Sequence, residues 1–229
     1  MRVETMRITY PEDPVKKQFI KLAEEYARKR MQNLRSSHGW DHVSRVVRMA
    51  LHIAEAEGAD TFVVLMASLL HDIARDEENA SNGQACHARE GYRLTLEFLT
   101  AANMEHPVAL HIARCIKTHR FRSDNMPESL EAKVLFDADK IDSIGAVGIG
   151  RAFLFSGEVG ARLHNDEHTD ILSTRAYTEE DTAYREFMVK LQYISDRLFT
   201  EEGKRIARAR HQFMTEYFNR LHLEVTGEA

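Results

Sequence analysis

Hydrophobic positions recur every three or four residues along most of the chain, which is the period that places side chains on one face of an α-helix. This spacing predicts helices that begin near residues 14, 40, 61, 87, 107, 130 and 143, and two further helices after residue 177. No segment shows the strict alternation of apolar and polar residues that marks a half-buried strand. The pattern therefore predicts an all-α protein.

Short polar residues and a glycine mark the ends of several predicted helices. Asp13 stands before a proline, the residue favoured at the first helical position, and Asp60 stands before the apolar segment TFVVLMASLL. Ser129 can cap the helix that follows it, and Gly58 can end the helix that precedes it. These residues predict where the helices of the first half begin and end.

One stretch departs from the helical pattern. Residues 157–177 show no clear period, and we interpret them as a long loop or arm, in which HNDEH is a solvated loop, a lid or a dimer contact. We predict one domain, residues 1–229, made of a core at about 20–156, the arm, and C-terminal helices at 178–222 that pack on the core.

Two helices are predicted after the arm. Thr178 and Asp181 resemble a capping box, the reciprocal pairing that opens a helix. The last helix carries one stripe of residues: Ile206, Arg210, Phe213, Tyr217 and Leu221. The basic residues of the segment EEGKRIARARHQ fit the polar side of this amphipathic helix better than a nucleic-acid surface.

The composition is ordinary for a soluble globular protein, with 43% hydrophobic and 29% charged residues. The net charge of −5 gives no global basic footprint, so we expect no stable nucleic-acid partner. No apolar run approaches the roughly 18 residues of a membrane span, and the N-terminus has no signal-peptide pattern. Cys86 and Cys115 are too few for a disulfide framework. We therefore expect a cytoplasmic protein without a membrane partner.

A strongly apolar helix is predicted to end in two adjacent polar residues, His71 and Asp72, within LLHDIARD. Such groups are costly to bury alone, so they either cap and solvate the helix end or hold a ligand there. His42 and Asp139 lie on or beside other predicted core helices. Capping and ordinary ion pairs explain any one of these residues, but the whole set favours convergence on one divalent cation.

His38 and His42 are four residues apart, which is the spacing of the HExxH zinc motif. Gly39 occupies the position where that motif requires a glutamate, and it also indicates that the helix begins near Trp40, after His38. A hydrolase of the HExxH class is therefore not expected.

The residues His42, His71, Asp72 and Asp139 form the pattern H…HD…D, which resembles the motif of the HD-domain metal-dependent phosphohydrolases. The resemblance extends to four longer segments: GWDHVSRVVRMALHIAEAEGAD, LMASLLHDIAR, DADKIDSIGAVGIGRAF and KRIARARHQFM. These segments look like the small bacterial members that include nucleoside triphosphate pyrophosphohydrolases, over about residues 20–220. The resemblance implies one HD-domain helical bundle in which the four residues bind a divalent ion (Mn²⁺, Mg²⁺, Co²⁺, Ni²⁺ or Fe²⁺). A second metal ion is left open.

Phosphoryl transfer needs positive charge near the reacting group, and three residues are candidates to supply it. Arg75 and Lys140 closely follow the implied ligands and are expected to act in catalysis, as is Asp72, which could help to orient the attacking water. Arg45, one helical turn after His42, is a candidate for binding substrate phosphate, although a surface ion pair with an aspartate also explains it.

Two further histidines, His87 and His119, lie between the HD pair and the last aspartate of the motif. In larger HD sites, by the same resemblance, such histidines hold a second metal ion or touch the substrate, and we interpret both as phosphate contacts. Glu77 and Glu78 follow the HD pair closely enough to act as acid or base, and they fit solvated loop charge equally well.

The resemblance predicts a metal-dependent hydrolase of phosphate esters or anhydrides with a small nucleotide as its substrate. The specific expectation is hydrolysis of (deoxy)nucleoside triphosphates to monophosphates and pyrophosphate. A nucleotide phosphomonoesterase or a cyclic-nucleotide phosphodiesterase would use the same ligands. A di-iron oxygenase and a non-catalytic nucleotide sensor are alternatives from other classes, and a homodimer is left open.

Overall fold

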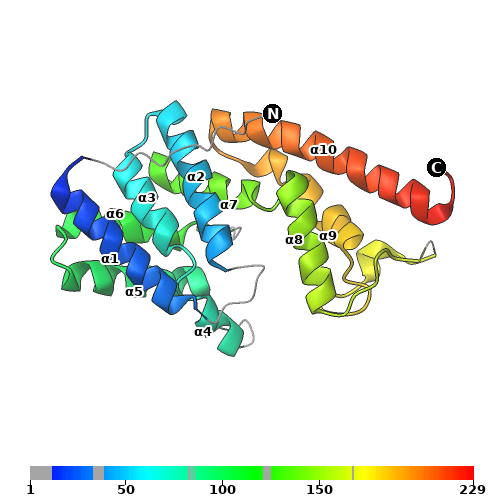
Figure 1. Cartoon of the computed structure of the whole chain (residues 1–229), viewed down its shortest axis with the longest axis horizontal. Helices are drawn as coiled ribbons and strands as arrows, with labels where there is room; N and C mark the ends of the chain where they lie inside the picture. The colour runs from blue at the N-terminus through cyan, green and yellow to red at the C-terminus, as the bar shows by residue number, and fades with distance from the viewer. Residues whose placement is uncertain (1–11, 33–38, 82–83, 85, 121–124, 167) are drawn as a thin grey trace. The chain divides into compact units, whose positions relative to one another are not determined.

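The computed structural model describes residues 12–32, 39–81, 84, 86–120, 125–166 and 168–229. Within these residues every regular element is helical, which confirms the predicted all-α class. The contacts divide the chain into two compact units, Met1–Asp139 and Lys140–Ala229 (Figure 1). That the two units form one domain stays a prediction. Among the described helices, none combines the length and the apolar character needed to cross a membrane.

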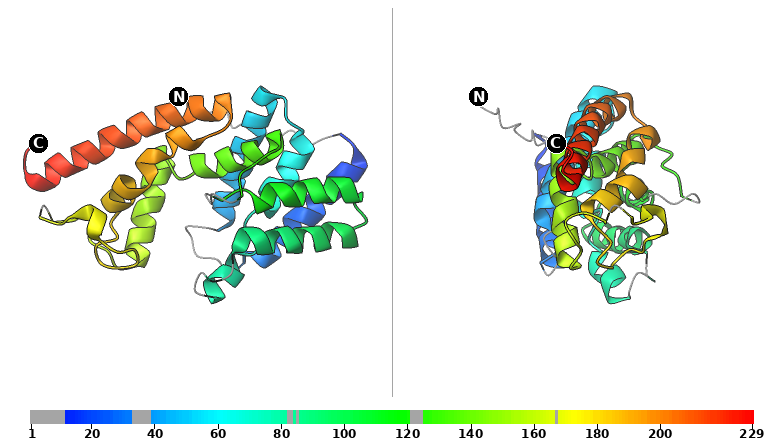
Figure 2. Two further views of the ribbon diagram at one scale, coloured as in Figure 1. Left: turned by 180° about the vertical axis from the view of Figure 1, so that it is seen from behind. Right: turned by 90° about the vertical axis from the view of Figure 1, so that its right-hand side faces the viewer.

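The first unit is built around the short helix α3. Its helices are α1 (Pro14–Arg30), α2 (Trp40–Glu57), α3 (Thr61–Leu70), α4 (Arg75–Ala80), α5 (His87–Ala101), α6 (His106–Lys117) and α7 (Leu130–Ile141), the last of which continues into the second unit. α3 packs against α1, α2 and α6, and α5 packs along α6 (Figure 2). Every residue of α3 from Phe62 to Leu70 is buried, so this helix forms the centre of the core.

The predicted ends of these helices are confirmed. The Asp13 carboxylate accepts a hydrogen bond from the first turn of α1, and the Asp60 carboxylate accepts from two backbone N–H groups of α3. Ser129 Oγ accepts from the first turn of α7 at 3.2 Å. Gly58 ends α2 with a φ of 74°, in the left-handed region that glycine adopts without steric cost.

The second unit contains α8 (Gly145–Glu158), the 3₁₀ turns η2 (Ile171–Ser173), η3 (Leu191–Tyr193) and η4 (Ser195–Arg197), the short helix α9 (Ala183–Val189) and the long helix α10 (Glu201–Thr226). α8 packs against α9 and α10. The predicted arm at 157–177 is confirmed, because η2 is the one regular element that begins within it among the described residues.

The capping box predicted at Thr178 is wrong. Thr182 caps α9 instead, and its side chain accepts a hydrogen bond from Arg185 N at 3.0 Å. Asp181 turns back to the arm, where one carboxylate oxygen accepts from Tyr177 N at 2.7 Å. The continuous helix expected after this point is broken into α9 and two 3₁₀ turns.

The stripe predicted for the last helix is only partly correct. Phe213 and Tyr217 are exposed, by 49% and 36%, whereas Met214 and Phe218, one position further along, are buried. The buried face also carries the small residues Gly203 and Ala207. Because small residues let a neighbouring backbone approach closely, they favour this face over its neighbour, which is about 100° away around the helix.

Candidate metal centre

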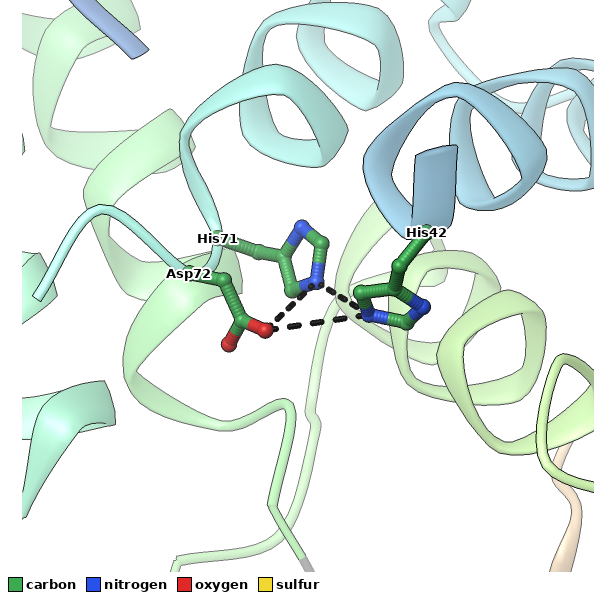
Figure 3. Close-up of side chains that lie close together, drawn as sticks. All are labelled: His42, His71 and Asp72. Carbon is green, nitrogen blue, oxygen red and sulfur yellow. Dashed lines mark hydrogen bonds and ion pairs between the residues drawn. The ribbon is translucent and has the colours of Figure 1, made fainter. Parts of the chain in front are cut away.

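Three predicted ligands meet at the end of α3. His42 projects from the first turn of α2, His71 is the residue that ends α3, and Asp72 follows it. His42 Nε2 lies 3.2 Å from His71 Nε2, and Asp72 Oδ2 lies 3.7 Å and 3.6 Å from these two nitrogens (Figure 3). All three side chains are buried, so their polar atoms face one another rather than solvent.

Asp139 joins the same cluster from α7. Its Oδ1 lies 3.3 Å from His42 Nε2 and 4.0 Å from His71 Nε2. The structure therefore brings together the four residues predicted as ligands, although they come from widely separated parts of the sequence. That they bind a metal stays a prediction.

The other oxygen of Asp72 faces a second pair of histidines. Asp72 Oδ1 lies 3.4 Å from His87 Nε2 and 3.7 Å from His119 Nε2, and these two nitrogens are 3.1 Å apart. His87 opens α5, His119 follows α6, and both are fully buried. Each histidine pair forms, with Asp72, a group that could hold a metal ion. Asp72 therefore stands between two candidate cation positions.

Backbone carbonyls fix the orientation of two of these imidazoles. His71 Nδ1 lies 2.8 Å from Ser68 O, and His119 Nδ1 lies 2.6 Å from Ile116 O. Because a carbonyl oxygen only accepts, each Nδ1 carries the proton and donates it. In the neutral ring Nε2 then has a free lone pair that points at the cluster. This is the arrangement by which proteins orient a histidine as a metal ligand.

Burial favours the neutral form of His71 and His87. Desolvation lowers the pKa of His71 to about 4, although the nearby Asp72 and Asp139 carboxylates act in the opposite direction. Desolvation also lowers the pKa of His87 to about 4. Burial alone would raise the pKa of Asp72, but the Arg75 guanidinium and the surrounding histidines hold it well below its usual range. Neutral imidazoles and an ionised carboxylate are the forms that bind metal ions.

The donor set fits a divalent cation on a further observation. Asp72 Oδ2 is buried without any hydrogen-bond partner. A carboxylate oxygen in that state is costly to bury, and an ion among the four side chains would compensate it. Imidazole nitrogen together with carboxylate oxygen suits Mn²⁺, Fe²⁺, Co²⁺, Ni²⁺ or Mg²⁺ better than a closed, sulfur-rich structural zinc site.

Of the three basic residues predicted to contact phosphate, Arg75 has a contact with this cluster that the structure shows directly. Arg75 Nε lies 3.0 Å from Asp72 Oδ1, so its guanidinium pairs with a carboxylate of the cluster. Arg45 is half-buried on α2. Lys140 is half-buried on α7 and belongs to the second unit. The phosphate contacts of all three stay predictions. His38 lies outside the described residues.

Glu78 and Arg120 complete the surroundings of the second histidine pair. Glu78 Oε2 lies 2.5 Å from His87 Nδ1, and Glu78 Oε1 lies 2.6 Å from Arg120 Nη1. Sequence reasoning left Glu78 open between an acid or base and solvated charge, and it did not single out Arg120. The segment around Glu78 is polar throughout, so no contrast with apolar neighbours distinguished this residue.

Comparisons with known proteins agree with the fold and the site. The HD domain model matches residues 39–144, a range that contains the four predicted ligands together with His87 and His119. The YpgQ protein of Bacillus subtilis (strain 168) is 33% identical over 192 residues, which cover 84% of this chain and 86% of that protein.

Solved structures resemble this one over nearly the whole chain. The crystal structure of B. subtilis YpgQ has a TM-score of 0.72 at 27% identity, covering 94% of this chain and 100% of that one. The structure of YpgQ in complex with ADP has a TM-score of 0.69 at 28% identity, with 92% and 96% covered. An HD-superfamily hydrolase from Bacillus thuringiensis has a TM-score of 0.71 at 26% identity, with 92% and 98% covered. This chain thus belongs to the HD-domain family and is a metal-dependent phosphohydrolase.

Proposed function

We propose that this protein hydrolyses (deoxy)nucleoside triphosphates to nucleoside monophosphates and pyrophosphate with the help of a divalent cation. The observation that carries the proposal is the buried cluster of His42, His71, Asp72 and Asp139, whose donor atoms converge and whose Asp72 Oδ2 lacks a hydrogen bond. The ADP complex of YpgQ supports a nucleotide as the ligand, since that protein is 33% identical to this chain over the matched residues.

The four residues of the cluster would hold the cation. A divalent ion there supplies Lewis-acid polarisation of a phosphoryl oxygen and makes a water molecule more acidic. In the reaction, a water oxygen forms a bond to the α-phosphorus, the bond from that phosphorus to the bridging oxygen breaks, and pyrophosphate leaves. A proton from the water passes to an acceptor in the site.

Other residues would stabilise the charge on the phosphates. Arg75 is the cation whose position next to Asp72 supports this role most directly. Lys140 is likewise proposed to stabilise charge on the reacting phosphoryl group, and Arg45 is proposed to bind substrate phosphate. His87 and His119 would contact a phosphate oxygen, or hold a second cation together with Asp72.

Metal analysis of the purified protein followed by a nucleotide assay tests the proposal. The panel contains ribo- and deoxyribonucleoside tri-, di- and monophosphates and cyclic nucleotides, with Mn²⁺, Mg²⁺, Co²⁺ or Ni²⁺ added to chelator-treated protein. Phosphate and pyrophosphate are measured separately. We expect pyrophosphate from triphosphates and no release after chelation. Phosphate release from monophosphates, or opening of cyclic nucleotides alone, would overturn the proposed substrate class.

The group of Asp72, His87 and His119 supports a second candidate of a different class, a di-iron oxygenase. Both histidine pairs would then bind iron, with Asp72 between the two ions. Two iron atoms per chain and oxygen consumption without release of phosphate or pyrophosphate would favour this candidate. One divalent ion per chain together with nucleotide turnover would exclude it.

A further inference from the structure

Glu78 is fixed at both of its carboxylate oxygens by neighbours from two other segments. Oε2 accepts a hydrogen bond from His87 Nδ1 on α5 at 2.5 Å, and Oε1 accepts from Arg120 Nη1, just after α6, at 2.6 Å. Arg75 Nη1, on the same helix α4, lies 3.5 Å from Oε2. Only 12% of the Glu78 side chain is exposed. A glutamate anchored in this way has little freedom to turn towards solvent.

This contact decides which nitrogen of His87 carries the proton. A carboxylate accepts hydrogen bonds and donates none, so Nδ1 must be the protonated nitrogen that faces Glu78. In the neutral ring Nε2 then presents a lone pair to Asp72 Oδ1 at 3.4 Å and to His119 Nε2 at 3.1 Å. In its neutral form His119 Nε2 also presents a lone pair, because its Nδ1 donates to a backbone carbonyl.

Without Glu78 the opposite tautomer of His87 would be favoured. A proton on Nε2 could be donated to His119 Nε2 or to Asp72 Oδ1, both of which accept. Glu78 therefore opposes the hydrogen bond that the second histidine pair would otherwise form. Two acceptor lone pairs that face each other in the protein interior destabilise the fold. We therefore expect them to bind a cation or to accept a proton from a ligand.

We infer that Glu78 is a positioning residue that fixes the tautomer and the ring orientation of His87, so that His87 Nε2 presents its lone pair to a cation or to a proton donor such as the attacking water. The effect on hydrolysis rests on the proposed function, whereas the effect on the tautomer follows from the contacts alone. Residues that orient a histidine in this way typically change activity by about 10–100-fold when they are replaced.

The tautomer can be measured directly by long-range ¹H–¹⁵N NMR of the imidazole rings, on metal-free protein and on protein with diamagnetic Mg²⁺. In the wild type we expect His87 to be protonated at Nδ1. In Glu78→Gln, whose amide is of the same size and can donate to Nδ1, we expect the proton to move to Nε2. With nucleotide as substrate, kcat should fall about 10–100-fold, while KM changes much less. An unchanged tautomer in Glu78→Gln would overturn the inference.

Two variants distinguish a role of Glu78 in orienting His87 from a role in merely holding α4 in place. Arg120→Gln removes the contact at Glu78 Oε1 but keeps the carboxylate that accepts from His87, so the tautomer should stay as in the wild type. Glu131→Gln removes another glutamate–histidine pair of the first unit, with His111 at 3.2 Å, and should leave the tautomer of His87 and kcat unchanged. If Arg120→Gln shifts the tautomer as far as Glu78→Gln does, Glu78 acts only as an anchor and the inference fails.

The remaining outcomes also decide between the two proposals. If the wild type turns over no nucleotide, the proposed function fails, and the NMR result still tests the positioning of His87. If Glu78→Gln shifts the tautomer but keeps the wild-type kcat, the orientation of His87 has no part in hydrolysis and the positioning role is overturned. Thermal unfolding of each variant, followed by circular dichroism, shows whether a lost rate comes from lost structure.

Discussion

Each unit of the molecule contains a buried polar cluster, but the two clusters differ in how their atoms are paired. In the second unit, Arg185 Nη1 donates to Asp181 Oδ1 at 2.7 Å, and the same guanidinium donates to the hydroxyl and the carbonyl of Thr174. Thr182 Oγ1 donates to Asn165 Oδ1 at 2.6 Å, and Asn165 Nδ2 donates to a backbone carbonyl at 2.9 Å. None of these five side chains has a buried polar atom without a partner.

In the first unit, the cluster around Asp72 contains a buried polar atom that has no hydrogen-bond partner. Asp72 Oδ2 has no hydrogen bond, and the Nε2 atoms of His87 and His119 lie 3.1 Å apart, where both are acceptors when each ring is neutral and donates from Nδ1. A self-paired cluster stabilises a fold, in this case by holding the arm against the start of α9. An incomplete cluster has a cost that a bound cation or substrate can offset. Both clusters are largely buried and contain ionisable side chains, so the pairing of their atoms is what distinguishes a candidate site from a structural network.

The largest effect is expected at Asp72, which lies between both histidine pairs. Asp72→Ala should remove the bound metal ion and reduce hydrolysis by more than the roughly 100-fold seen when a residue only orients a ligand. The helical circular dichroism spectrum should be retained. Metal content by elemental analysis and turnover of nucleotide check this prediction, and retained activity in a folded variant would show that the site lies elsewhere.

The second cluster should respond to mutation in the opposite manner. Arg185→Met leaves the buried Asp181 carboxylate without its cation and should lower the free energy of unfolding by about 3–5 kcal/mol. Metal content per folded chain should not change. Urea unfolding followed by circular dichroism, with elemental analysis of the folded protein, tests both parts. Loss of metal from folded Arg185→Met protein would mean that the two clusters are not independent.

The first cluster could be predicted from the sequence because its residues contrast with their surroundings. His71 and Asp72 end a helix that is otherwise apolar, and Asp139 interrupts another apolar stripe. Each of these polar residues can therefore be identified from the sequence pattern alone. Helix ends were predictable for the same reason, since Asp60 and Gly58 have conformational preferences that apolar residues lack. The family resemblance then linked residues that spacing alone leaves unrelated.

Features that depend on three-dimensional pairing were not predictable. Glu78 sits in a polar segment, where its sequence context equals that of its neighbour Glu77, yet it alone contacts His87. On α10, apolar residues occupy two adjacent faces, and packing against α8 rather than hydrophobicity selects the face of Met214 and Phe218. Thr178 and Thr182 offer similar caps, and the turn of the arm decides between them.

Acid should destabilise the first cluster when no metal is bound. His71 has a pKa of about 4 in the folded protein and 6.5 as its ordinary value, so the unfolded chain takes up the proton first as the pH falls. The free energy of unfolding should therefore decrease from pH 6.5 towards pH 4, by about 3 kcal/mol for this group at 1.36 kcal/mol per pKa unit. Asp72 contributes only at lower pH, because its pKa is held below its usual range.

Urea unfolding of chelator-treated protein at pH 7.5, 6 and 5 measures this dependence. His87 shares the lowered pKa of about 4, so His87→Gln should flatten the decrease. Addition of Mn²⁺ should oppose the loss at pH 6, because a bound cation stabilises the folded state increasingly as its concentration rises. A stability that does not change between pH 7.5 and pH 5 would indicate that these histidines are not buried in their neutral form.

The smallest effect is expected at Arg75, and it tests whether the incomplete cluster also receives substrate. Arg75→Ala should lower kcat or raise KM about tenfold while the metal content is maintained, because the guanidinium would act on phosphate charge rather than on the cation. The exposed Arg48 on α2 offers a matched control, since Arg48→Ala removes the same charge from the surface of the same unit. Arg75 also pairs with Asp72 Oδ1 at 3.0 Å, so a loss of metal in Arg75→Ala would instead assign it to the orientation of that ligand. The two results separate a residue that binds substrate from one that completes the cluster.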